Sequence, residues 1–189
     1  MKVLRKLYME TDRFEIGDRI KVKFKGETHT ASAIKREANG MLFVLDECLD
    51  ESRPMNANSS NEGGYDKTNL RKYLQQKALE LPKEFRDKMV PFENGDILRL
   101  IRLAELTGEN TKWDKVCEPL DFFKDGKHRI AYCKEIDDWS WYWLEDTIVT
   151  LSTSFAVCDR FGYSCSNNAS YSGGVRPLFK IRVSETEDL

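Results

Sequence analysis

Apolar and polar residues alternate with a period of two early in the chain. Residues 20–25 place isoleucine, valine and phenylalanine between lysines, which is the pattern of a half-buried β-strand. A weaker alternation covers residues 28–34, and residues 41–45 form a continuous apolar run. The Asn39-Gly40 pair between them is a strong hairpin signal. This pattern predicts an antiparallel, three-stranded opening to the fold.

The pattern then changes to the period of an α-helix. Apolar side chains share one stripe of a helix predicted over residues 67–79, with Asp66 as its N-cap. Pro82 ends that helix and can begin a second, shorter one. Residues 97–101 predict a short strand, and residues 103–106 predict a third short helix. Two or three helices are therefore expected, with residues 107–128 largely irregular.

Aromatic residues are densest just after residue 138. Residues 139–144 predict a single strand, with Trp139, Trp141 and Trp143 on one face and Tyr142 on the other. Two interpretations remain open. The tryptophans form the core beneath the sheet, or they form a stacking platform for a sugar or a peptide, with Tyr142 as its most exposed member. The acidic neighbours that could bind hydroxyl groups or a calcium ion are Asp137, Asp138, Glu145 and Asp146.

A hairpin and a closing strand are predicted for the C-terminal part. Residues 155–158 and 163–166 form the hairpin, and residues 175–183 form the last strand. Pro177 lies near the start of that strand, where a missing backbone donor is tolerated. Arg176 is expected to be structural. It would tie loops through backbone carbonyls or pair with one of the acids at positions 145 and 146.

Length and composition indicate one folded domain. The chain has 189 residues, of which 40% are hydrophobic and 33% charged, and it is rich in aromatic residues. Such a composition supports one core, expected over residues 14–183 of a single domain spanning 1–189, between a short charged N-terminal segment and an acidic tail. The formal net charge of −2 and the lack of a basic, aromatic-interleaved run argue against a nucleic-acid partner.

No apolar run is long enough to cross a membrane, and the first residues lack the apolar stretch of a secretory signal. A cytoplasmic protein with no membrane partner is therefore expected. Any surface role would require assembly into a particle, such as that of a phage.

The five cysteines are expected to be free thiols. No Cys-x-x-Cys motif occurs, and the two histidines, His29 and His128, lie far apart in the sequence, so no metal site and no cofactor are expected. Cys158 and Cys165 would face each other if Phe161-Gly162 were a two-residue turn. No catalytic residue is identified, because acid/base and nucleophile motifs are missing from the sequence.

Four segments resemble the motifs of a known family. Residues 68–74 read Thr-Asn-Leu-Arg-Lys-Tyr-Leu, and residues 142–147 read Tyr-Trp-Leu-Glu-Asp-Thr. Residues 156–162 read Ala-Val-Cys-Asp-Arg-Phe-Gly, and residues 175–178 read Val-Arg-Pro-Leu. In this order they resemble an uncharacterised bacterial and phage domain family with Trp-Trp-Leu-Arg-Ser-Pro and Val-Arg-Pro-Ala motifs. Here Glu-Asp replaces the Arg-Ser of the family, so any role of that arginine is lost or inverted.

The resemblance implies an α+β domain with a C-type-lectin-like fold, in which twisted antiparallel sheets carry a few helices and much irregular loop. This fold is shared by formylglycine-generating enzymes and phage receptor-binding proteins. The leading hypothesis is a non-catalytic binding or structural module with a glycan or protein partner, encoded by a phage or prophage. Its polar loops, residues 56–64 and 164–174, would suit recognition. The alternative is a thiol- or metal-dependent oxidoreductase that uses Cys158 and Cys165 and binds Cu(I).

Overall fold

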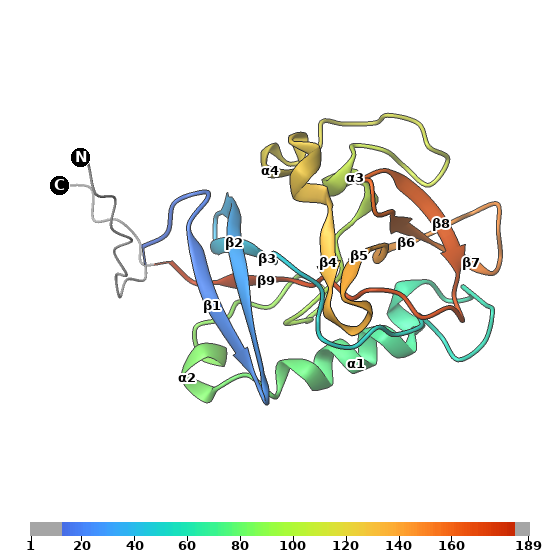
Figure 1. Cartoon of the computed structure of the whole chain (residues 1–189). Helices are drawn as coiled ribbons and strands as arrows, with labels where there is room; N and C mark the ends of the chain where they lie inside the picture. The colour runs from blue at the N-terminus through green and yellow to red at the C-terminus, as the bar shows by residue number, and fades with distance from the viewer. Residues whose placement is uncertain (1–12, 184–189) are drawn as a thin grey trace.

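A computed structural model describes residues 13–183 and has an α+β architecture built on antiparallel sheets (Figure 1). The charged N-terminal segment and the acidic tail expected from the sequence lie outside these residues. The first sheet contains β1 (Arg19–Phe24), β2 (Glu27–Glu37), β3 (Gly40–Leu45) and β9 (Leu178–Ile181), in that spatial order. The other two sheets contain β4 (Ala131–Cys133) with β5 (Asp138–Ser140), and β6 (Tyr142–Thr147), β7 (Ser154–Cys158) and β8 (Ser164–Asn168).

Helices are short and connect the sheets. The α-helices of the described residues are α1 (Asn69–Ala78), α2 (Lys83–Arg86), α3 (Leu103–Leu106) and α4 (Asp121–Lys124). The 3₁₀ turns are η1 (Tyr65–Lys67), η2 (Gly126–Arg129) and η3 (Lys134–Ile136). The α4 turn falls in a region expected to be irregular, where its buried Phe123 docks on the core. None of the helices within residues 13–183 has the length and apolar character needed to span a bilayer.

The predicted three-stranded opening is confirmed, and the closing strand completes that sheet. The antiparallel pairing of β1 with β2 and of β2 with β3 follows the alternation in the sequence. β9 then pairs with the free edge of β3, which places Phe179 opposite Phe43. The two rings stack with centroids 5.5 Å apart. The continuous apolar run at 41–45 is therefore explained by a central strand that is buried on both faces.

Two hydrophobic clusters lie on opposite faces of the same strands. Met41 and Phe43 of β3 belong to one cluster, and Leu42 and Val44 belong to the other. Strands of the β6–β7–β8 sheet contribute to both clusters in the same alternating way. In Figure 1 this sheet lies on the far side of the molecule from β1 and β2, with α1 running below both parts. The two sheets thus share their core rather than each enclosing one.

Two predictions for the middle of the chain are wrong. Thr68, and not Asp66, is the N-cap of α1, because its side chain accepts a hydrogen bond from the Arg71 N–H at 3.0 Å. Asp66 lies in the preceding η1 turn. Residues 97–101 do not form a strand; Arg99 and Ile101 make only isolated bridges to Leu178 and Leu144. The apolar run there is explained by burial in the core and not by a ladder.

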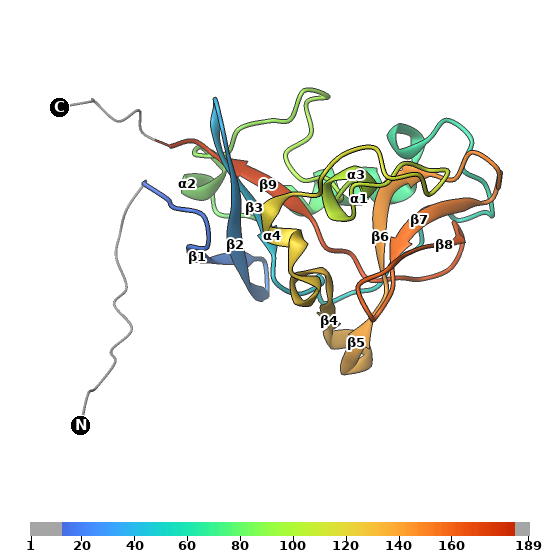
Figure 2. The same ribbon diagram turned by 90° about the horizontal axis from the view of Figure 1, so that it is seen from above.

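The strand predicted over residues 139–144 is wrong. The chain ends β5 at Ser140 and begins β6 at Tyr142, and these strands belong to different sheets. At Trp141 the backbone turns away to pair with Gly174, whose N–H donates to the Trp141 carbonyl at 3.1 Å. Figure 2 shows the β4–β5 hairpin projecting from the body of the molecule, while β6 runs back into it. The aromatic segment is therefore divided between a surface hairpin and the core.

Candidate functional site

A groove beside the β4–β5 hairpin exposes two large aromatic side chains. Trp139 is 52% exposed and Phe161 is 61% exposed. Together with four other residues they line a cavity of about 460 Å³, referred to below as the aromatic groove. The remaining residues of the aromatic groove are Lys127, Ile130, Asp138 and Arg160.

The β4–β5 hairpin holds Trp139 at the surface. Trp139 pairs with Tyr132 across the hairpin, and their rings meet edge to face with centroids 5.8 Å apart. Asp137 reverses the chain in a left-handed conformation, with a φ of 53°, and accepts a hydrogen bond from the Tyr132 hydroxyl. Asp137 therefore shapes the turn and does not line the groove. The Trp139 N–H donates to the side chain of Asp138 at 2.7 Å, which fixes that carboxylate at the rim.

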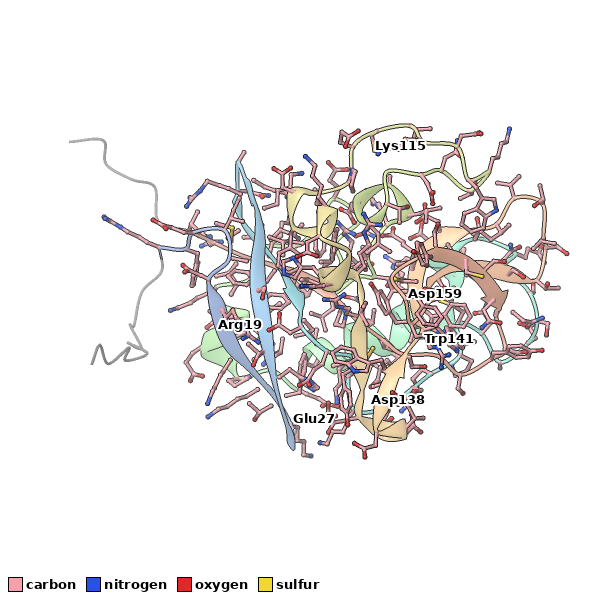
Figure 3. All side chains as sticks on the ribbon, turned by 45° about the horizontal axis from the view of Figure 1, so that its top comes forward. Arg19, Glu27, Lys115, Asp138, Trp141 and Asp159 are labelled. Carbon is pink, nitrogen blue, oxygen red and sulfur yellow. The ribbon has the colours of Figure 1, made fainter. Side chains whose placement is uncertain are left out.

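The turn between β7 and β8 holds Phe161 on the opposite wall. Oδ1 of Asp159 accepts hydrogen bonds from the N–H groups of Phe161 and Tyr163, both at 2.9 Å. Gly162 has a φ of 85°, and a Cβ there would lie 3.1 Å from the Gly126 carbonyl, so the tip is pressed against η2. Asp138 and Asp159, labelled in Figure 3, mark the two hairpins that carry the groove.

The charges at the aromatic groove are mixed, with an excess of one positive charge. Lys127 and Arg160 are cationic and exposed, while Asp138 is the acid of the lining. The guanidinium of Arg160 lies over the Phe161 ring, 4.8 Å from its centroid. Two exposed aromatic side chains and three charged groups therefore line one cavity.

The other aromatic residues of the segment belong to the core. Tyr142 is completely buried, which corrects the expectation that it would be the most exposed member. Its hydroxyl donates to the Arg129 carbonyl at 2.6 Å, and burial raises the pKa of this phenol well above its ordinary value. Trp143 is also buried and donates its indole N–H to the Arg53 carbonyl at 2.7 Å.

Trp141, labelled in Figure 3, lies between the exposed Trp139 and the buried Trp143 in the chain. It is half-buried and meets Trp143 edge to face, with centroids 5.0 Å apart. A Cβ on Gly173 would overlap the Trp141 ring, so this glycine is needed for the ring to lie against the backbone. Trp141 therefore closes the core and is not part of the aromatic groove.

Arg176 is the structural tie that the sequence predicts. It is almost completely buried, and its guanidinium donates to the carbonyls of Leu45 and His128 at 2.8 and 2.9 Å. It also donates to the Tyr142 hydroxyl at 3.2 Å. These contacts correspond to the first of the two expected roles, since the acids at 145 and 146 have other partners. Pro177 follows it, and its carbonyl accepts from the Leu45 N–H at 3.2 Å.

Glu145 and Asp146 lie near a second cavity, of about 310 Å³, beside the loop of Gly63 and Gly64. Burial raises the pKa of both carboxyl groups, although nearby arginines oppose this effect. Glu145 contacts Arg102 at 3.3 Å and Arg99 at 3.6 Å. Asp146 accepts from the N–H of Leu103 at 2.6 Å, at the start of α3. Both acids therefore connect β6 to its neighbours, away from Trp139.

The cysteine pair expected to face each other does not. In the β7–β8 ladder Cys158 is opposite Ser164, and Cys165 is opposite Val157, so the two thiols lie on opposite faces. Cys158 is buried, which raises the pKa of its thiol to about 11, and Cys165 is exposed. The expected two-residue turn is replaced by a longer one, residues 159–163, and this changes the register. The thiols that do meet are Cys48 and Cys133, whose sulfurs lie 3.1 Å apart in the core.

The two polar loops proposed for recognition are neighbours in space. The Asn56 N–H donates to the Ala169 carbonyl at 3.0 Å, and the hydroxyls of Ser59 and Ser170 are also 3.0 Å apart. Part of the second loop is the regular strand β8. The loops do not contribute to the aromatic groove.

Sequence reasoning identified Trp139 and Asp138 but missed the other four residues that line the groove. The missed residues are Lys127, Ile130, Arg160 and Phe161. A signal was present, because a phenylalanine at the tip of a predicted hairpin has no core to join. Comparisons of the chain with models of protein families, with curated proteins and with solved structures each gave no match.

Proposed function

We propose that this protein is a non-catalytic binding module whose aromatic groove takes an acidic glycan. The observation that carries the proposal is the pair of exposed aromatic side chains, Trp139 and Phe161, which two separate hairpins bring into the lining of one cavity. Exposed aromatic side chains in a concave site, surrounded by a few polar groups, are typical of ligand pockets. A sugar ring offers the matching surface, since its C–H groups cover one flat side.

The charges of the aromatic groove favour a glycan with a carboxylate. Lys127 and Arg160 provide two cations, and an arginine can bind a carboxylate through two parallel hydrogen bonds. Asp138 is fixed by the Trp139 N–H and can accept hydrogen bonds from ring hydroxyls. A neutral sugar would leave one of the cations without a partner in the groove.

The family resemblance suggests the fold and the biological context of this binding module. It supports a C-type-lectin-like fold and a component of a phage or prophage particle, made in the cytoplasm, that recognises a host surface. The alternative oxidoreductase has no support at Cys158 and Cys165, because these thiols lie on opposite faces of their hairpin.

A glycan array containing matched acidic and neutral oligosaccharides tests the proposal, followed by calorimetry on the bound sugars. We expect binding to the acidic members, with at least a tenfold loss of affinity in Trp139→Ala and in Phe161→Ala. Binding should also change the fluorescence of Trp139, the tryptophan of the aromatic groove, and this change should disappear in Trp139→Ala.

Tyr171→Ala is the matched control, because Tyr171 is 58% exposed and lies outside the lining of the groove. It should bind as the wild type does. Preference for neutral glycans would refute the role of Lys127 and Arg160. No binding to any glycan, or binding that survives both groove substitutions, would refute the site itself.

A further inference from the structure

A buried histidine meets three carboxylates at the end of the first sheet. The side chain of His29, on β2, is 1% exposed. Its Nε2 lies 3.0 Å from Oε2 of Glu27 and 3.8 Å from Oδ1 of Asp50. Its Nδ1 lies 3.3 Å from Oε1 of Glu47, without the alignment of a hydrogen bond. Figure 3 labels Glu27 at the end of the β1–β2 hairpin, toward the β4–β5 hairpin.

Each of the two carboxylates nearest to Nε2 also contacts a lysine through its other oxygen. Lys77 of α1 contacts Oε1 of Glu27 at 2.5 Å, and Lys134 contacts Oδ2 of Asp50 at 2.5 Å. Each carboxylate therefore has one oxygen engaged and the other directed toward the same imidazole nitrogen. One N–H on Nε2 can bond well to only one of these oxygens, so the two carboxylates compete for a single donor at this nitrogen.

The three facing atoms have the spacing of metal ligands. Oε2 of Glu27, Nε2 of His29 and Oδ1 of Asp50 all lie within 4.8 Å of one another. Two ligands about 2.1 Å from a tetrahedral zinc ion are roughly 3.4 Å apart, which lies between the 3.0 and 3.8 Å measured from Nε2. Both distances from Nε2 are therefore compatible with one shared ion, and the two carboxylate oxygens, within 4.8 Å of each other, could meet it through side-chain rotation.

We propose that Glu27, His29 and Asp50 bind a divalent transition-metal ion of the zinc type. Oε1 of Glu47 lies 3.3 Å from Nδ1 of His29, and a small rotation would let it accept the Nδ1–H and so fix the tautomer that presents Nε2 to the metal. A metal-bound histidine commonly makes this outer contact to a carboxylate. This site has no motif in the sequence, because Glu27 and His29 lie two residues apart but Asp50 comes from a separate segment.

The ligand set determines the preference among ions. Imidazole nitrogen with two carboxylate oxygens suits zinc and its first-row neighbours, whereas magnesium and calcium prefer oxygen alone. Asp50 is 24% exposed and Glu47 is 42% exposed, so an ion can reach the site from solvent. Three protein ligands leave a position for water, the arrangement found where zinc sites are open to exchange.

Calorimetric titration of chelator-treated, full-length protein with zinc tests the proposal. We expect saturable binding of one ion per chain, with affinity for calcium and magnesium at least a hundredfold weaker. His29→Gln and Asp50→Asn should each weaken zinc binding by at least tenfold. The second variant keeps the test valid if the first does not fold, because Asp50 is less buried than His29.

His128→Gln is the matched control, since His128 is the other histidine of the chain and bonds to the Phe122 carbonyl at 2.7 Å. It should leave zinc affinity unchanged. Cobalt(II) distinguishes this site from the Cys48–Cys133 thiols, because thiolate ligands give an intense charge-transfer absorption that nitrogen and oxygen ligands lack. Lack of saturable binding, a thiolate absorption, or full affinity in both His29→Gln and Asp50→Asn would overturn the proposal.

Discussion

Trp139 and Trp143 lie four residues apart in one aromatic segment but have opposite environments. Trp139 is half-exposed on a surface hairpin, and Trp143 is completely buried beside Phe155. The indole N–H of Trp143 donates to the backbone carbonyl of Arg53 inside the protein. The same residue type therefore contributes to a candidate ligand site in one case and to the core in the other.

The break at Trp141 causes this difference. A continuous strand would have placed all three tryptophans on one face, either all buried or all available to a ligand. Because the backbone instead turns to pair with Gly174, the chain leaves the β4–β5 hairpin and enters the third sheet. We therefore expect substitutions at Trp139 to change ligand affinity and substitutions at Trp143 to change the free energy of unfolding.

Trp143→Ala should have the largest effect on stability. Removing a buried indole from the core costs about 3–5 kcal/mol, whereas Trp139→Ala, at an exposed position, should change stability by no more than about 1 kcal/mol. Urea unfolding of the two variants, followed by circular dichroism, measures both values. Equal losses would show that the hairpin and the core are not separate environments.

Trp143→Phe shows how much of the stability lost in Trp143→Ala is due to the lost side-chain volume. It keeps most of the ring but removes the indole donor to the Arg53 carbonyl. That carbonyl also accepts from the Gly173 N–H at 3.1 Å, so it is not left without a partner. We therefore expect Trp143→Phe to recover more than half of the stability that Trp143→Ala loses.

Arg176→Leu should have the next largest effect. The arginine holds the Leu45 and His128 carbonyls together beside Tyr142, and a leucine would remove the donor from both, including the buried Leu45 carbonyl. Each such loss costs about 1–3 kcal/mol, partly offset because a buried guanidinium is itself costly to desolvate. We expect a net loss of about 2–3 kcal/mol in urea unfolding.

Arg176→Lys is the informative partner of that variant. A lysine keeps the charge but not the planar fork that reaches two carbonyls at once. It should therefore lose nearly as much stability as Arg176→Leu. Wild-type stability in Arg176→Lys would show that charge, and not the fork, is what the site requires.

The parts of the fold that depend on local pattern were predictable from the sequence. The alternation at 20–25, the Asn39-Gly40 turn and the helical stripe of α1 each gave the right element. The break at Trp141 was not predictable, because it depends on pairing with Gly174, thirty-three residues later. Local periodicity carries no information about such a long-range partner.

The candidate site also has a part that is predictable from local sequence and a part that depends on long-range packing. The density of aromatic residues after position 138 predicts Trp139 as a site residue. Phe161 joins it in the lining of the groove only because the β7–β8 turn packs against η2. Whether Cys158 and Cys165 face each other depends on the length of the turn between β7 and β8, and the Phe161-Gly162 pair does not determine that length. The His29 cluster joins β2 to the loop after β3, so only the folded sheet brings its ligands together.

Glu145, two residues beyond Trp143 on β6, should have the smallest effect, visible only in the pH dependence of stability. Burial raises the pKa of this carboxyl in the folded protein, so its favourable contribution is complete below the unfolded pKa of about 4.3 and is lost as pH rises through the folded value. Relative to Glu145→Gln, the wild type should therefore lose stability as pH rises from 4 toward neutrality.

Glu37 is the matched control of opposite sign. Its burial would raise the pKa, but Lys35 and Lys180 outweigh burial and lower the pKa of this carboxyl. Its contribution is therefore present above the unfolded pKa and is lost as pH falls through the folded value. Relative to Glu37→Gln, the wild type should gain stability as pH rises over the same range. Parallel slopes for the two pairs, measured by urea unfolding at each pH, would show that burial on β6 does not control the Glu145 carboxyl.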